Sequence, residues 1–367
     1  GGKYAKHWAF VPPVKPVPPS KGHPIDAFIK ENFPESIGFA TAADKSTLAR
    51  RLALVLTGLP PEPELLEFYL KDDSTNAYER LVEQLLADPR YGEHQARYWL
   101  DAVRYGDTHG LHLDNKRGIY PYRDWVVRAL NKNLPLDQFI EWQLAGDLHP
   151  NPTTEQLIAT GFVRMNPSTA EGGVIPAEFQ AKNNFDRTET LGTVFLGMSM
   201  LCSRCHTHKY DPITQTEYFE LMAFFNSTAE GPLDGNKYEY APVIKVPRDQ
   251  ARWNDWERLQ SERDLLLAKA ALTFQNPQGI ASEAKQKWDK ADIGTRLAMV
   301  VDENGPWKKA GLTIHEAAKR LAKRIGDAEK AFTTTLVAKE LGKPRETKLL
   351  QRGEYNLPTG DPLQPGV

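Results

Sequence analysis

Apolar residues return every three to four positions along much of the chain, the spacing that places them on one face of an α-helix. The first clear case carries Leu48, Leu52 and Leu56, and we expect Ser46 to cap this helix and Gly58 to end it. The same rhythm predicts three more helices before residue 105, at about residues 65–69, 74–88 and 91–103. The pattern therefore predicts a mainly α-helical fold.

Two stretches interrupt this rhythm. Residues 105–124 are polar and contain two histidines and three acidic residues, and residues 161–176 are irregular and rich in glycine and proline. A polar stretch such as residues 105–124 is typical of long ordered loops that carry function. The alternative is a surface loop whose Asp and Asn side chains satisfy the local backbone.

The remainder of the chain returns to regular spacing. We expect a helix over residues 177–200 and another that Thr214 or Thr216 caps. Residues 243–246 and 348–354 have the composition of short strands.

Two strongly charged stretches, residues 249–275 and 313–340, also carry apolar positions at helical spacing. They favour an antiparallel helical hairpin, and the alternative is a single solvated spacer. Residues 288–307, which lie between them, have a mixed pattern.

Composition sets wide limits on the function. The chain has 367 residues, 40% of them apolar and eight of them Trp, which is enough for a sizeable core and for more than one domain. A formal net charge of -2 gives no electrostatic reason to expect nucleic acid or an anionic membrane as a partner. No run of about 18 apolar residues occurs, so we expect no membrane span in this chain.

The clearest chemical signal is a C-x-x-C-H motif formed by Cys202, Cys205 and His206, which contains both cysteines of the chain. This spacing is the one that covalent attachment of a c-type haem requires. Each thiol would bond one vinyl group of the porphyrin, and His206 would bind the iron as the proximal ligand. The motif predicts one haem c per chain.

Three other structures share this spacing: a small disulfide loop, half of a zinc site and a thioredoxin-like redox pair. Zinc would need two further Cys or His ligands at matching spacing, and no second C-x-x-C is present. A redox pair would normally start a helix in a βαβ unit, a pattern that the sequence does not contain. The spacing therefore favours haem.

The ligand on the other side of the iron decides the chemistry. A Met ligand raises the reduction potential, a second His lowers it, and an open position allows peroxide, oxygen or another small ligand to bind. His208 is tethered too close to His206 to reach the opposite face. The distal candidates are His109, His112 and Met165, followed by Met198, Met200 and Met222.

The polar loop offers a further hypothesis. Its carboxylates and imidazoles could bind a divalent metal or line a polar distal pocket that moves protons, with Arg117 or Arg123 near the haem propionates. The four side chains concerned, which are also the catalytic candidates, are Asp107, His109, His112 and Asp114.

Several runs resemble the planctomycete cytochrome-associated family labelled PSCyt2, a domain of unknown function. They are residues 56–61, 101–110, 120–125, 143–148, 171–173 and 202–213, within a region of similarity over about 26–230. The resemblance implies an exported haem protein. Relatives often carry a cytochrome c domain upstream, and residues 353–366 resemble the beginning of a partner domain, PSD1, that usually follows.

These patterns divide the chain into four parts. They predict a Pro-rich linker or strap at residues 1–25, a PSCyt2-like haem-binding domain at 26–235, a helical hairpin or spacer at 236–345, and the start of a following domain or a tail at 346–367. The predicted fold is mainly α, an irregular multi-helix domain around one covalent haem, with long ordered loops and a C-terminal helical hairpin.

Two functions follow from a single covalent haem. The first is electron transfer to or from a redox partner domain or protein. The alternative is a haem enzyme with an open distal site that acts on peroxide or on a carbohydrate-derived substrate. Because haem attachment to C-x-x-C-H takes place outside the bacterial cytoplasm, we expect a periplasmic or otherwise exported protein. We further expect that a leader was removed, or that the chain is a piece of a longer exported protein.

Overall fold

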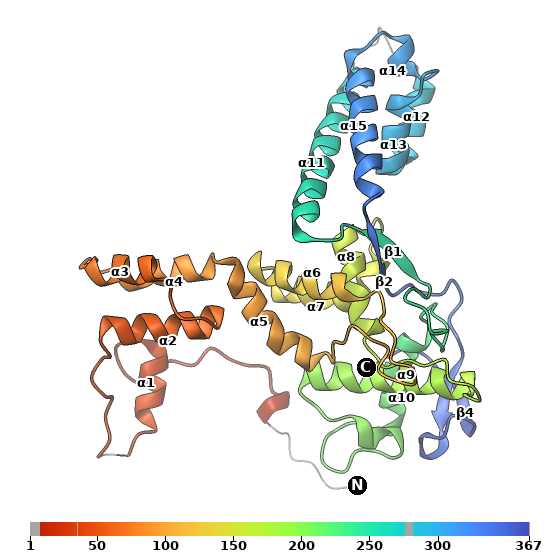
Figure 1. The fold of residues 1–367 in the computed structure, drawn as a ribbon. Coiled ribbons are helices and arrows are strands. Elements are labelled where there is room, and N and C mark those ends of the chain that lie inside the picture. The colour runs from red at the N-terminus through yellow and green to blue at the C-terminus, as the bar shows by residue number, and fades with distance from the viewer. Residues whose placement is uncertain (1–7, 35, 276–281, 367) are drawn as a thin grey trace.

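The computed structural model describes residues 8–34, 36–275 and 282–366. Helices dominate, and the strands of the described chain form two antiparallel pairs, β1 with β2 and β3 with β4 (Figure 1). The prediction of a mainly α fold is confirmed. Residues 11–19, the Pro-rich part of the predicted strap, are exposed to solvent.

The N-terminal helices pack into a small cluster of their own. Asp44 caps α2, because its Oδ1 accepts a 2.9 Å hydrogen bond from the backbone N–H of Thr47. The prediction of Ser46 as the cap was therefore wrong by two positions, whereas Gly58 ends the helix with a φ of 73°, as expected. The helices are α1 (Pro24–Glu31), α2 (Lys45–Thr57), α3 (Pro63–Lys71) and α4 (Ala77–Leu86).

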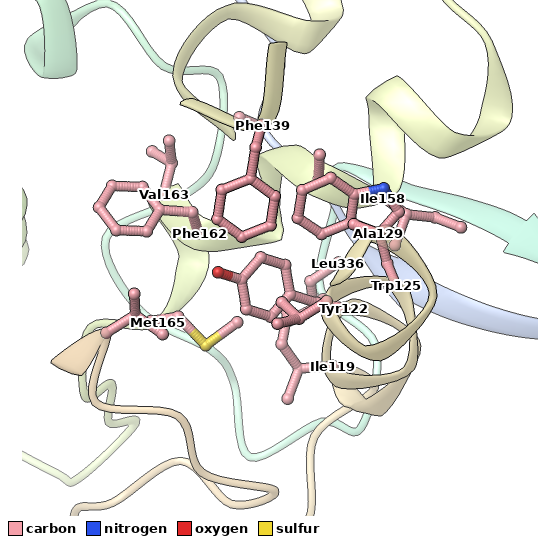
Figure 2. Close-up of a cluster of buried hydrophobic side chains, with 14 of the residues drawn as sticks. Ile119, Tyr122, Trp125, Ala129, Phe139, Ile158, Phe162, Val163, Met165 and Leu336 are labelled. Atoms are coloured by element: carbon pink, nitrogen blue, oxygen red, sulfur yellow. The ribbon is translucent and has the colours of Figure 1, made fainter. Parts of the chain in front are cut away.

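The main core forms where α5 to α8 meet. Figure 2 shows the rings of Tyr122, Trp125 and Phe139 gathered in this core, and those of Trp125 and Phe139 stack with centroids 5.2 Å apart. Burying large apolar side chains of this kind stabilises the fold by roughly 1.5–3 kcal/mol each. The helices are α5 (Pro89–Ala102), α6 (Tyr120–Asn131), α7 (Leu136–Ala145) and α8 (Thr154–Ala159).

A strand pair closes this core from the side. β1 (Val243–Val246) was predicted, and it pairs with β2 (Thr333–Leu336). The helix predicted to reach residue 340 ends at Glu329, because three consecutive β-branched threonines favour a strand over a helix. The end of β2 then enters the core, where Leu336 is buried.

Beyond this strand pair the chain forms a helical arm that projects from the body (Figure 1). Helices α11 (Gln250–Leu272) and α15 (Thr313–Glu329) pack against each other, which confirms the predicted hairpin. A solvated spacer is wrong, because Trp288 and Trp307 are buried together in the arm. The segment with the mixed pattern, residues 288–307, is helical. It takes in the end of α12 (Ser282–Lys290), all of α13 (Ile293–Val301) and the start of α14 (Pro306–Lys309).

The last part of the body joins distant segments. Helix α9 (Pro176–Leu191) lies against α10 (Gln215–Asn226), and the hairpin of β3 (Thr347–Leu350) and β4 (Pro358–Leu363) packs on α10. The helix predicted over 177–200 is shorter, since a π-helical turn, Gly192–Leu196, ends it. A Cβ on Gly192 would lie 2.4 Å from Sδ of Met200, so the chain folds back closely there.

Candidate functional site

The C-x-x-C-H motif begins on a short 3-10 turn, Leu201–Arg204, and its Cys205 and His206 follow directly in the loop that leads to α10. The carbonyl of Cys202 accepts from the backbone N–H groups of Cys205 (3.2 Å) and His206 (3.3 Å). These two bonds close the turn and hold both thiols and the imidazole on one short loop. The three side chains are exposed, and the two thiols are not joined in a disulfide.

The hydrogen bonding of His206 defines its tautomer. Its Nδ1 lies 2.8 Å from the carbonyl oxygen of Thr207, and because a carbonyl only accepts, Nδ1 carries the proton. The lone pair of the neutral ring is then on Nε2. A ligating histidine in proteins has this arrangement, with one nitrogen fixed by a backbone carbonyl and the other available to the metal.

Arg204, between the two cysteines, anchors the turn to α9. Its guanidinium lies 4.8 Å from the centroid of the Phe185 ring, and its Nη1 is 3.6 Å from Oε1 of Glu189. The same Oε1 accepts a 3.0 Å hydrogen bond from the hydroxyl of Tyr218 on α10. Burial raises the pKa of the Glu189 carboxyl, although Arg204 and Tyr218 oppose that rise. Burial and the nearby Glu189 also raise the pKa of Tyr218.

A loop leads from the motif to α10, and a reciprocal pair of hydrogen bonds caps the first turn of that helix. Thr214 accepts from the N–H of Glu217 (3.1 Å), and the Glu217 carboxylate accepts from the N–H of Thr214 (2.7 Å). This capping box confirms Thr214 as the predicted cap. Next to it, the Gln215 amide donates to the carbonyls of Arg204 (3.0 Å) and Leu350 (3.4 Å), which links the motif to β3.

His208 belongs to the loop that leads into α10. It is largely buried, and its Nδ1 accepts from the backbone N–H groups of Asp211 (2.7 Å) and Tyr210 (3.3 Å). An imidazole held in this way stabilises the turn before Pro212. The sequence excluded His208 only as a ligand on the opposite face of the iron, and its hydrogen bonds make it part of this turn.

The turn between β3 and β4 lies against the second cysteine. The Cys205 thiol donates to the carbonyl of Arg352 at 3.2 Å. Gly353 approaches so closely that a Cβ there would lie 2.9 Å from Cγ of Arg204 and 3.3 Å from Sγ of Cys205. Sequence reasoning missed this contact, because the hydrogen bond joins residues 147 positions apart and no local signal marks it.

Apolar side chains surround the motif on both sides. Beneath it, Met200 and Met222 are buried in a cluster with Phe219. On the surface, Leu201 and Tyr210 are exposed by 50% and 70%. Exposed apolar side chains of this size next to two thiols and an imidazole are suitable for contact with the face of a porphyrin. The donor set and its surroundings therefore fit a covalently attached haem.

The polar loop that was expected to supply a distal or metal site does not converge. His109 is buried, and its Nε2 donates to the carbonyl of Lys237 at 2.9 Å. Its Nδ1 lies 3.0 Å from Oγ of Ser168 and 3.3 Å from Oδ2 of the buried Asp234. Both ring nitrogens are thus engaged inside the fold, and His109 is not placed to bind an iron.

The other members of the predicted loop site face separate surroundings. His112 and Asp107 are exposed, and Asp114 accepts from the N–H of Gly110 at 2.8 Å. Hydrogen bonds from Thr108 and Gly110 lower the pKa of Asp114. Throughout the described ranges, no three or more His, Cys, Asp or Glu side chains are grouped so that they could hold a metal ion. The structure does not bring the four candidates together.

Arg117 and Met165 are structural as well. Arg117 is buried and donates to the carbonyls of Asn166 (2.9 Å) and Met165 (3.2 Å), and burial lowers its pKa. Met165 lies in the main core next to Tyr122 (Figure 2), because its unbranched side chain fills an apolar gap there. Arg123 forms a 2.8 Å ion pair with Asp124. Neither arginine contacts the motif through a hydrogen bond or an ion pair in the described chain.

Comparisons with known proteins give one positive result. No curated protein and no solved structure matches the chain. None of the helices in the described ranges combines the length and apolar character that crossing a bilayer needs. A family model described as PSCyt2, a protein of unknown function (DUF1549), matches residues 24–230, which is more than half of the chain. The chain therefore belongs to the PSCyt2 family.

Proposed function

We propose that this protein is an exported c-type haem protein that transfers electrons. Cys202 and Cys205 would hold one haem through thioethers, and Nε2 of His206 would bind its iron. The observation that carries this proposal is the exposed turn on which all three side chains lie, with Nδ1 of His206 donating to Thr207. When bound, the haem supplies one-electron redox chemistry at the iron.

The residues of the chain have defined tasks in this proposal. The carbonyl of Thr207 fixes the tautomer of His206 and orients its ring. Arg204, held over Phe185 and near Glu189, keeps the turn at the end of α9. Because the motif is exposed, a haem attached there would present an edge at the surface, where a redox partner can approach.

Electron transfer is favoured over the enzyme alternative because the buried imidazole of the polar loop is already hydrogen-bonded inside the fold. A haem enzyme that cleaves peroxide needs an acid–base group on the distal side. His109 and His112 were the imidazole candidates; the two ring nitrogens of His109 are engaged with Lys237 and Ser168, and His112 is exposed. We infer a periplasmic or otherwise exported location from the chemistry of attachment, which takes place outside the bacterial cytoplasm.

The proposal is tested by producing the protein together with a cytochrome-maturation system. We expect one haem per chain by the pyridine haemochrome assay and pigment that acid acetone does not extract. Replacing both Cys202 and Cys205 with alanine should give a colourless, folded protein. A colourless wild-type protein would overturn the proposal.

A second measurement separates the two functions. A six-coordinate, low-spin spectrum that carbon monoxide does not change supports electron transfer, whereas rapid carbon monoxide binding supports an open distal site and a reaction with peroxide or a carbohydrate-derived substrate. His206→Asn should change the spectrum by removing the proximal ligand. The matched control is His112→Asn, because His112 is exposed with a φ of 55°, a backbone conformation that asparagine tolerates.

A further inference from the structure

The β3–β4 hairpin lies outside residues 24–230, the region matched by the family model, yet it makes direct contact with the motif. Its first strand is fixed to α10 at two points. Asn226 donates to the hydroxyl of Thr347 at 2.9 Å, and Gln215 bridges the carbonyls of Leu350 and Arg204. Leu349, Leu350 and Leu363 also pack on the apolar cluster beneath the motif. The hairpin is therefore part of the packing that supports the two cysteines.

The hairpin's turn has an unusual backbone where it reaches Cys205. Arg352 has a φ of 54° and Gly353 a φ of 72°, both in the left-handed region. An arginine rarely adopts this conformation, and residues held in it tend to cluster at functional sites. The consequence here is that the carbonyl of Arg352 points at the Cys205 thiol, while Gly353 fits in a space that no larger residue could occupy without displacing Arg204.

We propose that the β3–β4 hairpin is one wall of the haem site and that Gly353 is the residue that sets its distance from Cys205. This inference rests on the proposed haem attachment. The thioether that Cys205 would form with the haem then lies against residues 351–357, the turn of the hairpin.

Attachment itself makes the hairpin sensitive to the haem. The Sγ–H of Cys205 adds across a vinyl group: a sulfur–carbon bond forms, the hydrogen goes to the other vinyl carbon, and no oxidant is needed. The resulting thioether sulfur has no hydrogen to donate, so the carbonyl of Arg352 loses its 3.2 Å bond. The turn must therefore readjust around the new substituent, and its backbone amides should report that change.

The first experiment compares hydrogen–deuterium exchange in the protein with and without haem. Exchange of the peptide covering residues 346–357 should slow several-fold on attachment, because the haem would cover this wall and shield its amides from water despite the lost thiol bond. Exchange in α11 and α15 of the arm should not change. Haem stoichiometry is measured on the same sample. One haem per chain with unchanged exchange in the hairpin would overturn this inference alone, and a protein without haem would overturn it together with the proposed function.

The second experiment uses two glycines of the same hairpin. Gly353→Ala adds a methyl group against Arg204 and Cys205, whereas Gly360→Ala adds one where nothing lies within 4 Å, at a closely similar φ of 74°. Both variants acquire the same backbone strain, so only Gly353→Ala should shift the haem absorption bands and the reduction potential. Equal spectra and potentials in the two variants would contradict the assignment. If Gly353→Ala does not fold, Gln215→Met, which removes the bridge to Leu350, should produce the same shift.

Discussion

The polar segment predicted as a loop over residues 105–124, which gives way to α6 at Tyr120, and the motif turn with His206 contain similar side chains in opposite situations. In the loop, His109 is buried and both of its ring nitrogens have partners. At the motif, His206 is exposed and one nitrogen bonds the carbonyl of the next residue. A histidine becomes available to a metal when the fold engages one nitrogen and leaves the other with its lone pair. By this criterion His109 is a structural imidazole and His206 is a candidate ligand.

The arginines of the two regions differ in the same way. Arg117 donates to backbone carbonyls and is buried, so it holds the loop together from inside. Arg204 is partly exposed and lies between Phe185 and Glu189, where it positions the turn without being enclosed. We therefore expect substitutions in the loop to lower stability and substitutions at the motif to change the haem.

The largest effect should come from Arg117→Ala. Its side chain satisfies buried carbonyls of Met165 and Asn166, and each unpaired buried carbonyl costs about 1–3 kcal/mol, so we expect a loss of about 3 kcal/mol in the free energy of unfolding. Urea denaturation measures this loss. The haem spectrum of the folded variant should equal that of the wild type.

Arg123→Ala is the control for this prediction. Arg123 pairs with Asp124 at a partly exposed position, so its removal should cost less than about 1 kcal/mol. If Arg117→Ala changed the haem spectrum instead of the stability, the loop would contribute to the haem site and the comparison between the two regions would fail.

The next largest effect is a difference between two histidine substitutions. His109→Ala leaves the carbonyl of Lys237 without its buried donor, and should cost about 2 kcal/mol. His206→Ala removes an exposed side chain and should change the free energy of unfolding by less than about 0.5 kcal/mol, yet it should alter the haem spectrum. Urea denaturation and absorption spectroscopy measure the two effects. A spectral change in His109→Ala together with a loss of stability in His206→Ala would contradict the roles given to both histidines.

Thr214→Ala should have a smaller effect on stability but a local effect on the motif. Loss of the capping box costs about 1 kcal/mol and loosens the first turn of α10, which begins beside the cysteines. Thr153→Ala removes the equivalent box from α8 and should cost a similar amount. Only Thr214→Ala should shift the reduction potential, and an equal shift in both variants would show that the capped turn does not support the motif.

Much of the fold follows from local sequence. The spacing of apolar residues predicted the first helices, the Gly58 end of α2, the Thr214 cap and the hairpin of α11 and α15. These features depend on residues close together in the chain, so their signals are present in short windows. The helix predicted to reach residue 340 ends at Glu329, because the threonines that follow favour a strand. The pairing with β1 that completes this strand is made across a long separation in the chain.

The candidate site also has a part that local sequence predicts and a part that depends on long-range contacts. Cys202, Cys205 and His206 are adjacent, and their spacing alone indicates the chemistry that we propose. Nε2 of His109 is engaged by the carbonyl of Lys237, which is 128 positions away in the chain. The contact of Cys205 with Arg352 spans 147 positions. No local pattern could have predicted either. Which histidine is engaged and which segment covers a cysteine are decided by tertiary structure.

The smallest expected effect is a pH dependence that originates beside the motif. Burial raises the pKa of Glu189 above its usual 4.5, so over a range above that value the folded protein holds a proton that the unfolded chain has released. The folded state then binds more protons, and the free energy of unfolding falls as the pH rises through that range. Glu189→Gln removes this titration and keeps an oxygen that can accept from Tyr218. Urea denaturation at a series of pH values from about 4 to about 7 should therefore show a decline in the wild type that the variant lacks. If the stability curves of the wild type and the variant were parallel, Glu189 would be solvated as an ordinary carboxylate. Water would then reach the apolar cluster beneath the motif more freely than the packing of Tyr218 and Phe185 indicates.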